Sequence, residues 1–158
     1  MLGLAAVALA QLAQATLPSS AAAQERMQLG TPLSPAIEFQ TQVGDRVFFS
    51  ESSAELGSRA RAALEAQAAW LRRYSTLPVI IEGHADDSGL NAHNQEVSRR
   101  RAEAVRRRLI ESGVAPERIV VQAYGRERLI AEGTAPACSA QNRRVVTVVV
   151  PPNAAAAP

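Results

Sequence analysis

Residues 77–110 read LPVIIEGHADDSGLNAHNQEVSRRRAEAVRRRLI, and this stretch decides the fold. It opens on a nearly continuous run of β-branched and apolar residues over 77–84, as expected for a central strand that is buried on both faces. The polar loop ADDSG over 85–89 ends that strand. From about 91 to 112 the apolar positions recur at helical spacing, and Gly113 stands where a C-terminal cap belongs. The stretch therefore predicts a buried strand, a polar loop and a long helix.

Shorter patterns on either side predict the remaining elements. Before the stretch, RVFF over 46–49 is β-prone, and apolar residues at helical spacing predict a helix over 58–74. After it, residues 118–124 and 145–150 read as two further strands, so the predicted order is βαβαββ. Crossover helices of this length join parallel strands, whereas a loop can add the last strand. We therefore predict an α+β fold with a mixed four-stranded sheet and helices packed on one face.

The chain of 158 residues has room for one domain and its tails. Residues 1–23 combine an apolar stretch, a Pro-Ser-Ser break and three alanines, which predicts a secretory signal segment. Residues 24–43 are rich in Gln, Pro, Ser and Thr, and we interpret them as a linker. This places the folded domain at 44–150 and a disordered tail at 151–158.

The charge of the chain gives no support for a nucleic-acid partner, and we predict none. Lys and Arg total 17 against 15 Asp and Glu, and the net charge of +2 is too small to indicate nucleic acid or an anionic membrane. The helix predicted over 91–112 does carry a cluster of arginines. However, Glu96 precedes Arg100 by four residues, and Glu103 precedes Arg107 by the same step, which is typical of solvated helix pairs. No aromatic residues interleave with the cluster for base stacking.

A metal or hydrolase site is suggested by the closeness of His84, Asp86 and His93 in the sequence. No third reliable ligand and no nucleophile with its base accompanies them, so structural or solvated histidines are expected. Cys138 has no partner for a disulfide and matches no metal spacing. We predict no enzyme activity, no metal and no cofactor.

The predicted helix carries an arginine within its apolar stripe, which steps by four through Val97, Arg101, Val105 and Leu109. A guanidinium keeps its proton and is costly to bury without an anion, so Arg101 requires a carboxylate nearby. Asp86, in the loop before the helix, is the natural candidate, and Asn94 lies about two turns before Arg101 on the same face. Spacing alone leaves two interpretations open: a ligand site, or an internal pair that fixes the loop to the helix.

The run GHADDSGLNAHNQEVSRRRAEAVRRRL resembles the signature of OmpA-like peptidoglycan-binding domains, and more closely that of the peptidoglycan-associated lipoproteins of the Tol system. Flanking stretches resemble further motifs of the same family, in the same order: VFFSESSAEL, EGHAD, AYGRERL and QNRRV. The resemblance covers residues 44–150, the whole predicted domain.

The resemblance implies a site for the free D-centre of meso-diaminopimelate, which carries one ammonium and one carboxylate. Asp86 would accept from the ammonium and Arg101 would donate to the carboxylate, with the motif's Asn94 beside them. Charge-assisted hydrogen bonds of this kind give both strength and orientation.

The same resemblance suggests that the loop after the first strand, with Ser52 and Ser53, and either Arg143 or Arg144 complete the pocket. The sequence departs from the family in this loop, because Ser-Glu-Ser stands at 50–52 where Asp-Phe-Asp is frequent. Asp-Ser at 87–88 likewise replaces a commoner Glu-Arg.

The implied function is non-covalent binding of peptidoglycan in the periplasm, which would link the outer membrane and envelope to the cell wall. Relatives of the lipoprotein type carry a lipidated cysteine after the signal, whereas no cysteine precedes Cys138, so we expect no lipid anchor site in this chain. The alternative is a Tol-system protein-interaction module with a TolB-like periplasmic partner and weak or no peptidoglycan binding. Substitution of Asp86 or Arg101 by alanine separates the two, because only the first function depends on that pair.

Overall fold

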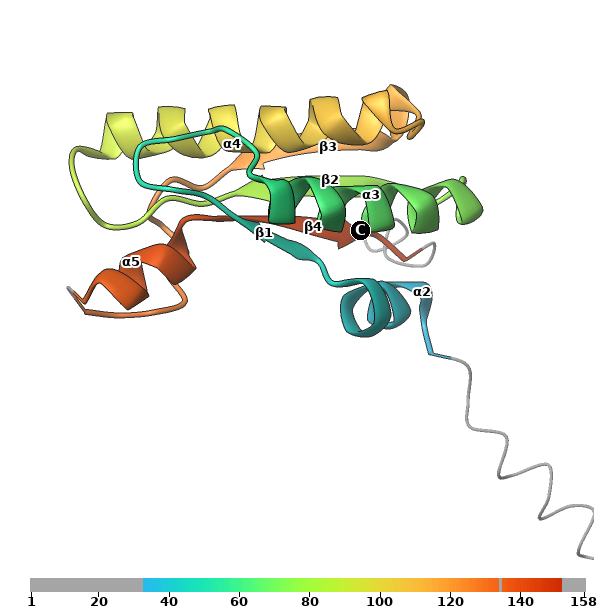
Figure 1. Cartoon of the computed structure of the whole chain (residues 1–158), viewed down its shortest axis with the longest axis horizontal. Helices are drawn as coiled ribbons and strands as arrows, with labels where there is room; N and C mark the ends of the chain where they lie inside the picture. Colours follow the sequence, from blue (N-terminus) through green and yellow to red (C-terminus); the bar gives the residue numbers. More distant parts are fainter. Residues whose placement is uncertain (1–32, 134, 152–158) are drawn as a thin grey trace, which may run out of the picture. The chain divides into compact units, whose positions relative to one another are not determined.

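The structure is a computed structural model, and it describes residues 33–133 and 135–151. The predicted signal segment, the first part of the predicted linker and the tail beyond Pro151 lie outside the described residues. Figure 1 shows the arrangement of the elements. In chain order they are α2 (Pro35–Glu38), a π-helical turn η1 (Phe39–Val43), β1 (Arg46–Phe48), α3 (Ser58–Arg73), β2 (Val79–Gly83), α4 (Asn91–Glu111), a 3-10 turn η2 (Pro116–Arg118), β3 (Ile119–Ala123), α5 (Pro136–Asn142) and β4 (Arg144–Val149).

The four strands form one mixed sheet in the order β1-β4-β2-β3. Strands β2 and β3 are parallel and are joined through α4, whereas β4 runs antiparallel to both β1 and β2. The predicted βαβαββ order and the mixed sheet are therefore confirmed, and every predicted strand and helix ends within two residues of its observed bounds. The loops that follow β1 and β2 lie at the same edge of the sheet as the start of β4, because β4 is antiparallel to both.

Helices α3 and α4 pack against each other and cover one face of the sheet, with α4 over β2 and β3 and α3 beside β1 (Figure 1). Alternate strand residues such as Val79, Ile81 and Val145 are fully buried on this face. They meet the apolar stripes of the helices, which include Leu64, Leu71, Val105 and Leu109.

Strand β2 approaches α4 very closely at Gly83. A β-carbon built at that position would lie 2.1 Å from the carbonyl oxygen of Ser98 and 3.1 Å from the β-carbon of Ala102. Only glycine permits this contact, because the first clash is with the helix backbone rather than with a side chain that could turn away. The contact sets the end of β2, and hence the loop after it, against the N-terminal half of α4.

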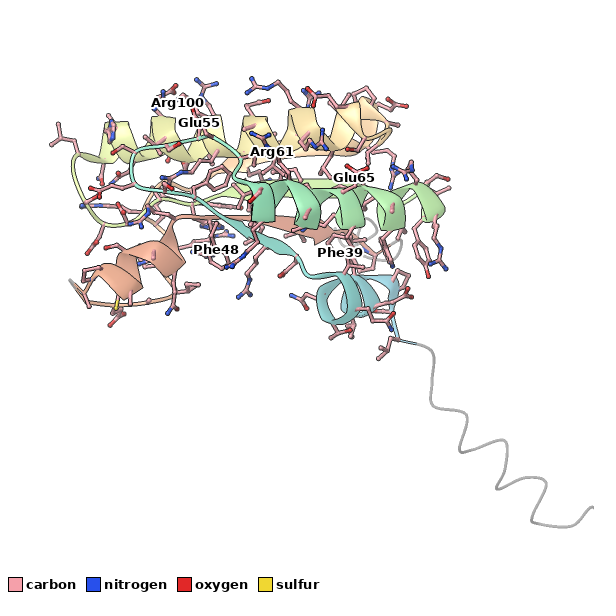
Figure 2. All side chains as sticks on the ribbon, viewed as in Figure 1. Phe39, Phe48, Glu55, Arg61, Glu65 and Arg100 are labelled. Atoms are coloured by element: carbon pink, nitrogen blue, oxygen red, sulfur yellow. The ribbon has the colours of Figure 1, made fainter. Side chains whose placement is uncertain are left out.

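The predicted domain boundary at residue 44 is wrong, because the fold begins earlier. Residues 35–43 are helical and carry Phe39 (Figure 2). The Phe39 side chain is only 1% exposed, and its ring centroid lies 5.0 Å from that of Trp70. The carboxylate of Glu38 accepts hydrogen bonds from the Trp70 indole and the Tyr74 hydroxyl, both at 2.9 Å. Residues 35–43 read PAIEFQTQV, and this short mixture of apolar and polar residues has too little periodicity to show that Phe39 is a core residue.

The connection between β3 and β4 contains a short helix, α5, that the sequence patterns did not predict. It begins at Pro136 in the first helical turn, where the missing N–H of proline costs nothing. In the described part of the chain, no helix is long and apolar enough to span a bilayer.

Candidate functional site

Asp86 lies three residues beyond the end of β2 and is buried. One carboxylate oxygen accepts from Nη1 of Arg143 at 3.0 Å. The other accepts from the backbone N–H of Ser88 at 3.2 Å and from the Ser88 hydroxyl. The aspartate therefore closes the turn of its own loop and joins that loop to the entry of β4.

The surroundings of Asp86 favour its ionised form. Burial alone raises the pKa of this carboxyl, but the hydrogen bonds from Ser88 and Arg143 and the positive charge of Arg143 outweigh burial. The pKa therefore lies below its ordinary value, and Asp86 is a carboxylate at neutral pH.

Arg101 projects from α4 and is only 1% exposed. Its Nε donates to the carbonyl oxygen of Ser53 at 2.8 Å, and its Nη2 donates to that of Ser50 at 2.9 Å. These two carbonyls lie at the two ends of the turn after β1, so the guanidinium holds that turn against the helix. A longer bond of 3.4 Å runs from Nη1 to the carbonyl oxygen of His84.

Asp86 and Arg101 do not form a direct ion pair, because the ion pair of Asp86 is with Arg143. Within the described residues, Arg101 makes hydrogen bonds to carbonyl groups but has no carboxylate within 4.0 Å. Burial lowers the pKa of Arg101 to about 10, an effect that the nearby Asp86 charge opposes, so the guanidinium remains charged. The structure therefore does not contain the internal Asp86–Arg101 ion pair that was one of the two interpretations of the sequence.

Asn94 is buried in the same cavity as Asp86 and Arg101, and its Nδ2 amide group finds no hydrogen-bond partner in the described part of the chain. The cavity has a volume of only about 10 Å³, roughly enough for one water molecule. The residues that line it are Ser52, Ala85, Asp86, Ser88, His93, Asn94, Val97 and Arg101. Sequence reasoning missed Ser88, although an aspartate two residues before a serine is a signal for a side-chain-closed turn.

The two serines that were predicted to belong to the site, Ser52 and Ser53, differ in their roles. Ser52 lines the cavity and has a φ of +52°, the only positive φ outside glycine in the described residues. Such a backbone conformation is strained for a non-glycine residue and is found most often at functional sites. The Ser53 hydroxyl instead accepts from the backbone N–H of Glu55 at 3.0 Å, so only the Ser53 carbonyl takes part in the site, through Arg101.

Arg143 and Arg144, which the sequence did not distinguish, lie on opposite sides of the sheet. Arg143 contacts Asp86 and also donates from Nε to the carbonyl oxygen of Phe49 at 3.2 Å. Arg144 begins β4, and its Nη2 donates to the carbonyl oxygen of Arg128 at 3.1 Å on the face away from α3 and α4. The structure brings Arg143 to the site and keeps Arg144 away from it.

The two histidines, like the two arginines, lie on opposite sides of the sheet. His93 lines the cavity with Asp86, whereas His84 is buried toward the other face and stacks on Tyr124 with ring centroids 5.5 Å apart. No group of three His, Cys, Asp or Glu side chains lies close enough to hold a metal ion in the described part of the chain.

Part of the arginine cluster of α4 forms ion pairs within the helix, as the sequence predicted for this surface. Glu96 lies 2.8 Å from Arg99 and 3.9 Å from Arg100. The predicted partner of Glu103 was Arg107, but the pair observed is with Arg106, at 4.0 Å. Steps of three and of four both bring side chains together on a helix, so spacing alone did not select between them.

Two features define an OmpA-like domain. One is a mixed sheet with two helices on one face. The other is a set of three buried polar residues, Asp86 in the loop after β2 and Asn94 and Arg101 on α4. The profile of the OmpA family matches residues 48–143. This chain belongs to the OmpA family.

Two relatives named peptidoglycan-associated lipoprotein are similar over most of the chain. The protein from Mesorhizobium japonicum is 39% identical over 114 residues, which cover 72% of this chain and 68% of that protein. The protein from Brucella melitensis is 42% identical over 112 residues, covering 71% and 67% of the two chains.

Solved structures agree with this placement. The crystal structure of the peptidoglycan-associated lipoprotein from Burkholderia pseudomallei matches with a TM-score of 0.66 and 30% identity, over 77% of this chain and 98% of that one. The C-terminal domain of Helicobacter pylori MotB matches with a TM-score of 0.63 and 23% identity, over 67% and 84% of the two chains, which shows the fold alone.

Proposed function

We propose that this protein binds peptidoglycan non-covalently through the D-centre of meso-diaminopimelate. Asp86 accepts hydrogen bonds from the ammonium group of that centre, and Arg101 donates to its carboxylate. The Nδ2 group of Asn94, which has no partner among the described residues, supplies a further donor. The family membership and the names of the relatives support peptidoglycan as the target.

The charge of the cavity is the observation that carries this proposal. Two guanidinium groups, of Arg101 and Arg143, stand beside a single carboxylate, that of Asp86, which already pairs with Arg143. A buried arginine without a carboxylate of its own is costly, and a ligand carboxylate would remove that cost. A ligand that brings one carboxylate and one ammonium at neighbouring atoms fits both Arg101 and Asp86.

Binding requires the loop of residues 87–90 to move, because the present cavity has a volume of only about 10 Å³. That loop is exposed throughout, and Ser88 occupies one oxygen of Asp86. Turning Ser88 outward frees this oxygen for the ligand ammonium, while Arg143 keeps the other oxygen in place.

The names of the relatives support a location in the cell envelope. Within the envelope, our proposal is that the chain binds peptidoglycan in the periplasm and is associated with the outer membrane. The relatives carry the name of a peptidoglycan-associated lipoprotein rather than of an enzyme, and the proposal is one of binding rather than catalysis. A TolB-like partner belongs to the alternative function, a protein-interaction module.

The test is retention of the purified full chain on isolated peptidoglycan sacculi from a strain whose wall contains meso-diaminopimelate. Asp86→Asn and Arg101→Lys should each weaken binding by about tenfold or more, because each loses charge-assisted hydrogen bonds to the ligand. Free meso-diaminopimelate should compete with the sacculi. Cadaverine, which has the two ammonium groups of diaminopimelate but neither carboxylate, should not.

Neighbouring residues provide matched controls. Asp87→Asn and Arg100→Lys change the same chemical groups at exposed positions next to the site and should bind as the wild type does. Thermal melting of each variant separates loss of binding from loss of folding. Equal retention of the folded wild type, Asp86→Asn and Arg101→Lys would refute the proposal and favour the protein-interaction alternative.

A further inference from the structure

A second cavity lies on the face of the sheet that α3 and α4 do not cover, and its volume is about 330 Å³. Volumes of this size hold small ligands. Its polar lining comes from the segment before β1, from three strands and their ends, and from the loop after β3: Gln40, Asp45, Arg46, Glu82, His84, Arg128, Arg144 and Thr147. Apart from these groups, Val146 and Val148 of β4 give it an apolar floor. It shares no lining residue with the cavity of Asp86.

Strand register explains why these side chains meet. Arg144 is the partner of Phe48 across β1 and β4, and the backbone N–H of His84 donates to the carbonyl oxygen of Arg144 at 2.9 Å. Residues that face each other across a sheet share one side of it, so Phe48, Arg144 and His84 form a row. Phe48 on β1 is 53% exposed at the open end of this row (Figure 2).

Two buried polar groups in this cavity have no hydrogen-bond partner in the described part of the chain. His84 is 1% exposed, yet neither ring nitrogen is paired. Its Nε2 lies 3.8 Å from a Glu82 oxygen, which is too long for a hydrogen bond. Arg144 is 5% exposed, and its Nη1 is also without a partner. Buried polar groups are nearly always paired, so two such groups lining one cavity indicate a ligand.

The charges of the cavity leave one positive unit uncompensated. Arg46 lies 3.4 Å from Asp45, and Arg128 lies 3.5 Å from Glu82, so each of these arginines has an acid of its own. Arg144 has no carboxylate within 4.0 Å among the described residues. Burial, and then the charges of Arg144, Arg128 and Arg46, lower the pKa of His84 to about 4, so its ring is neutral at pH 7 and carries one N–H donor.

We propose that this cavity binds the carboxylate of a small, partly apolar ligand, which accepts hydrogen bonds from Nη1 of Arg144 and from the ring N–H of His84. A single negative charge matches the single uncompensated guanidinium. A phosphate group carries more charge than this, and Glu82 repels the excess. The apolar part of the ligand lies along Val146 and Val148.

The test is an NMR titration of the full chain at pH 7 in a buffer without carboxylates, with hexanoate as the probe. Hexanoate should shift the His84 ring signals and the Val146 and Val148 methyl signals saturably. Hexanol, which lacks the charge, should bind at least about tenfold more weakly.

Variants separate this cavity from the first site. Arg144→Gln should weaken hexanoate binding by about tenfold or more. Two control variants should leave hexanoate binding unchanged. Arg107→Gln makes the same change on an exposed part of α4, and Asp86→Asn alters the first site. Absence of saturable shifts in the wild type, or equal affinity in Arg144→Gln, would overturn the proposal. Tighter binding of inorganic phosphate than of hexanoate would overturn the assignment to a carboxylate.

Discussion

Asp86 contributes to stability as well as to the proposed site, because it closes its own loop and pairs with Arg143. At pH 7, Asp86→Asn should lower the free energy of unfolding by about 1–3 kcal/mol, the usual contribution of hydrogen bonds to a charged group. The folded-state pKa is depressed, so this stabilisation is complete above the ordinary pKa of 3.8 and is lost as the pH falls through the folded-state value.

Urea unfolding of both proteins at pH 7, 5 and about 2.5 measures this effect. The difference between them should be nearly constant from pH 7 to pH 5 and should close in strong acid, where the wild type also loses its carboxylate. Asp87→Asn is the control, since Asp87 is exposed. A difference that persisted unchanged in acid would show that the amide acts through packing instead.

The burial of Arg101 could be predicted because it has a visible cause in the sequence. An arginine within an apolar stripe of period four must be buried when the helix packs. The partners of Arg101 were not visible in the same way, since they are carbonyl oxygens of a turn some fifty residues earlier in the chain. Backbone carbonyls carry no sequence signal.

At the scale of elements, the contact between β2 and α4 holds the site together. It brings the loop of Asp86 against the helix that carries Asn94 and Arg101. Gly83→Ala should lower the free energy of unfolding by about 3 kcal/mol, because the new methyl group would meet the Ser98 carbonyl oxygen at 2.1 Å and force strand and helix apart.

Thermal and urea unfolding measure the effect of Gly83→Ala. Gly57→Ala is the matched control: a β-carbon there meets nothing within 4 Å, its φ is −67°, and the only expected cost is about 1 kcal/mol or less from its position as a helix N-cap. Equal stability of Gly83→Ala and the wild type would mean that the helix can shift without cost.

At the scale of the whole molecule, the segment before β1 belongs to the core. Phe39→Ala should lower the free energy of unfolding by about 3–5 kcal/mol, because Phe39 is buried against Trp70 and its removal leaves a cavity. Phe48→Ala removes the same side chain from an exposed position and should cost about 1 kcal/mol or less (Figure 2). If the two variants were equally stable, residues 35–43 would be dispensable for the fold.

The order of the elements, their bounds to within two residues and the burial of Arg101 follow from patterns in the sequence. These features depend on local periodicity, which neighbouring residues set among themselves. Only the tertiary structure decided that Asp86 pairs with Arg143 rather than with Arg101, that Arg144 and His84 meet on the opposite face, and that Phe39 joins the core. The first two outcomes depend on the register between strands that are distant in the chain, where a shift of one residue would exchange the two faces. The burial of Phe39 depends on the packing of η1 against α3.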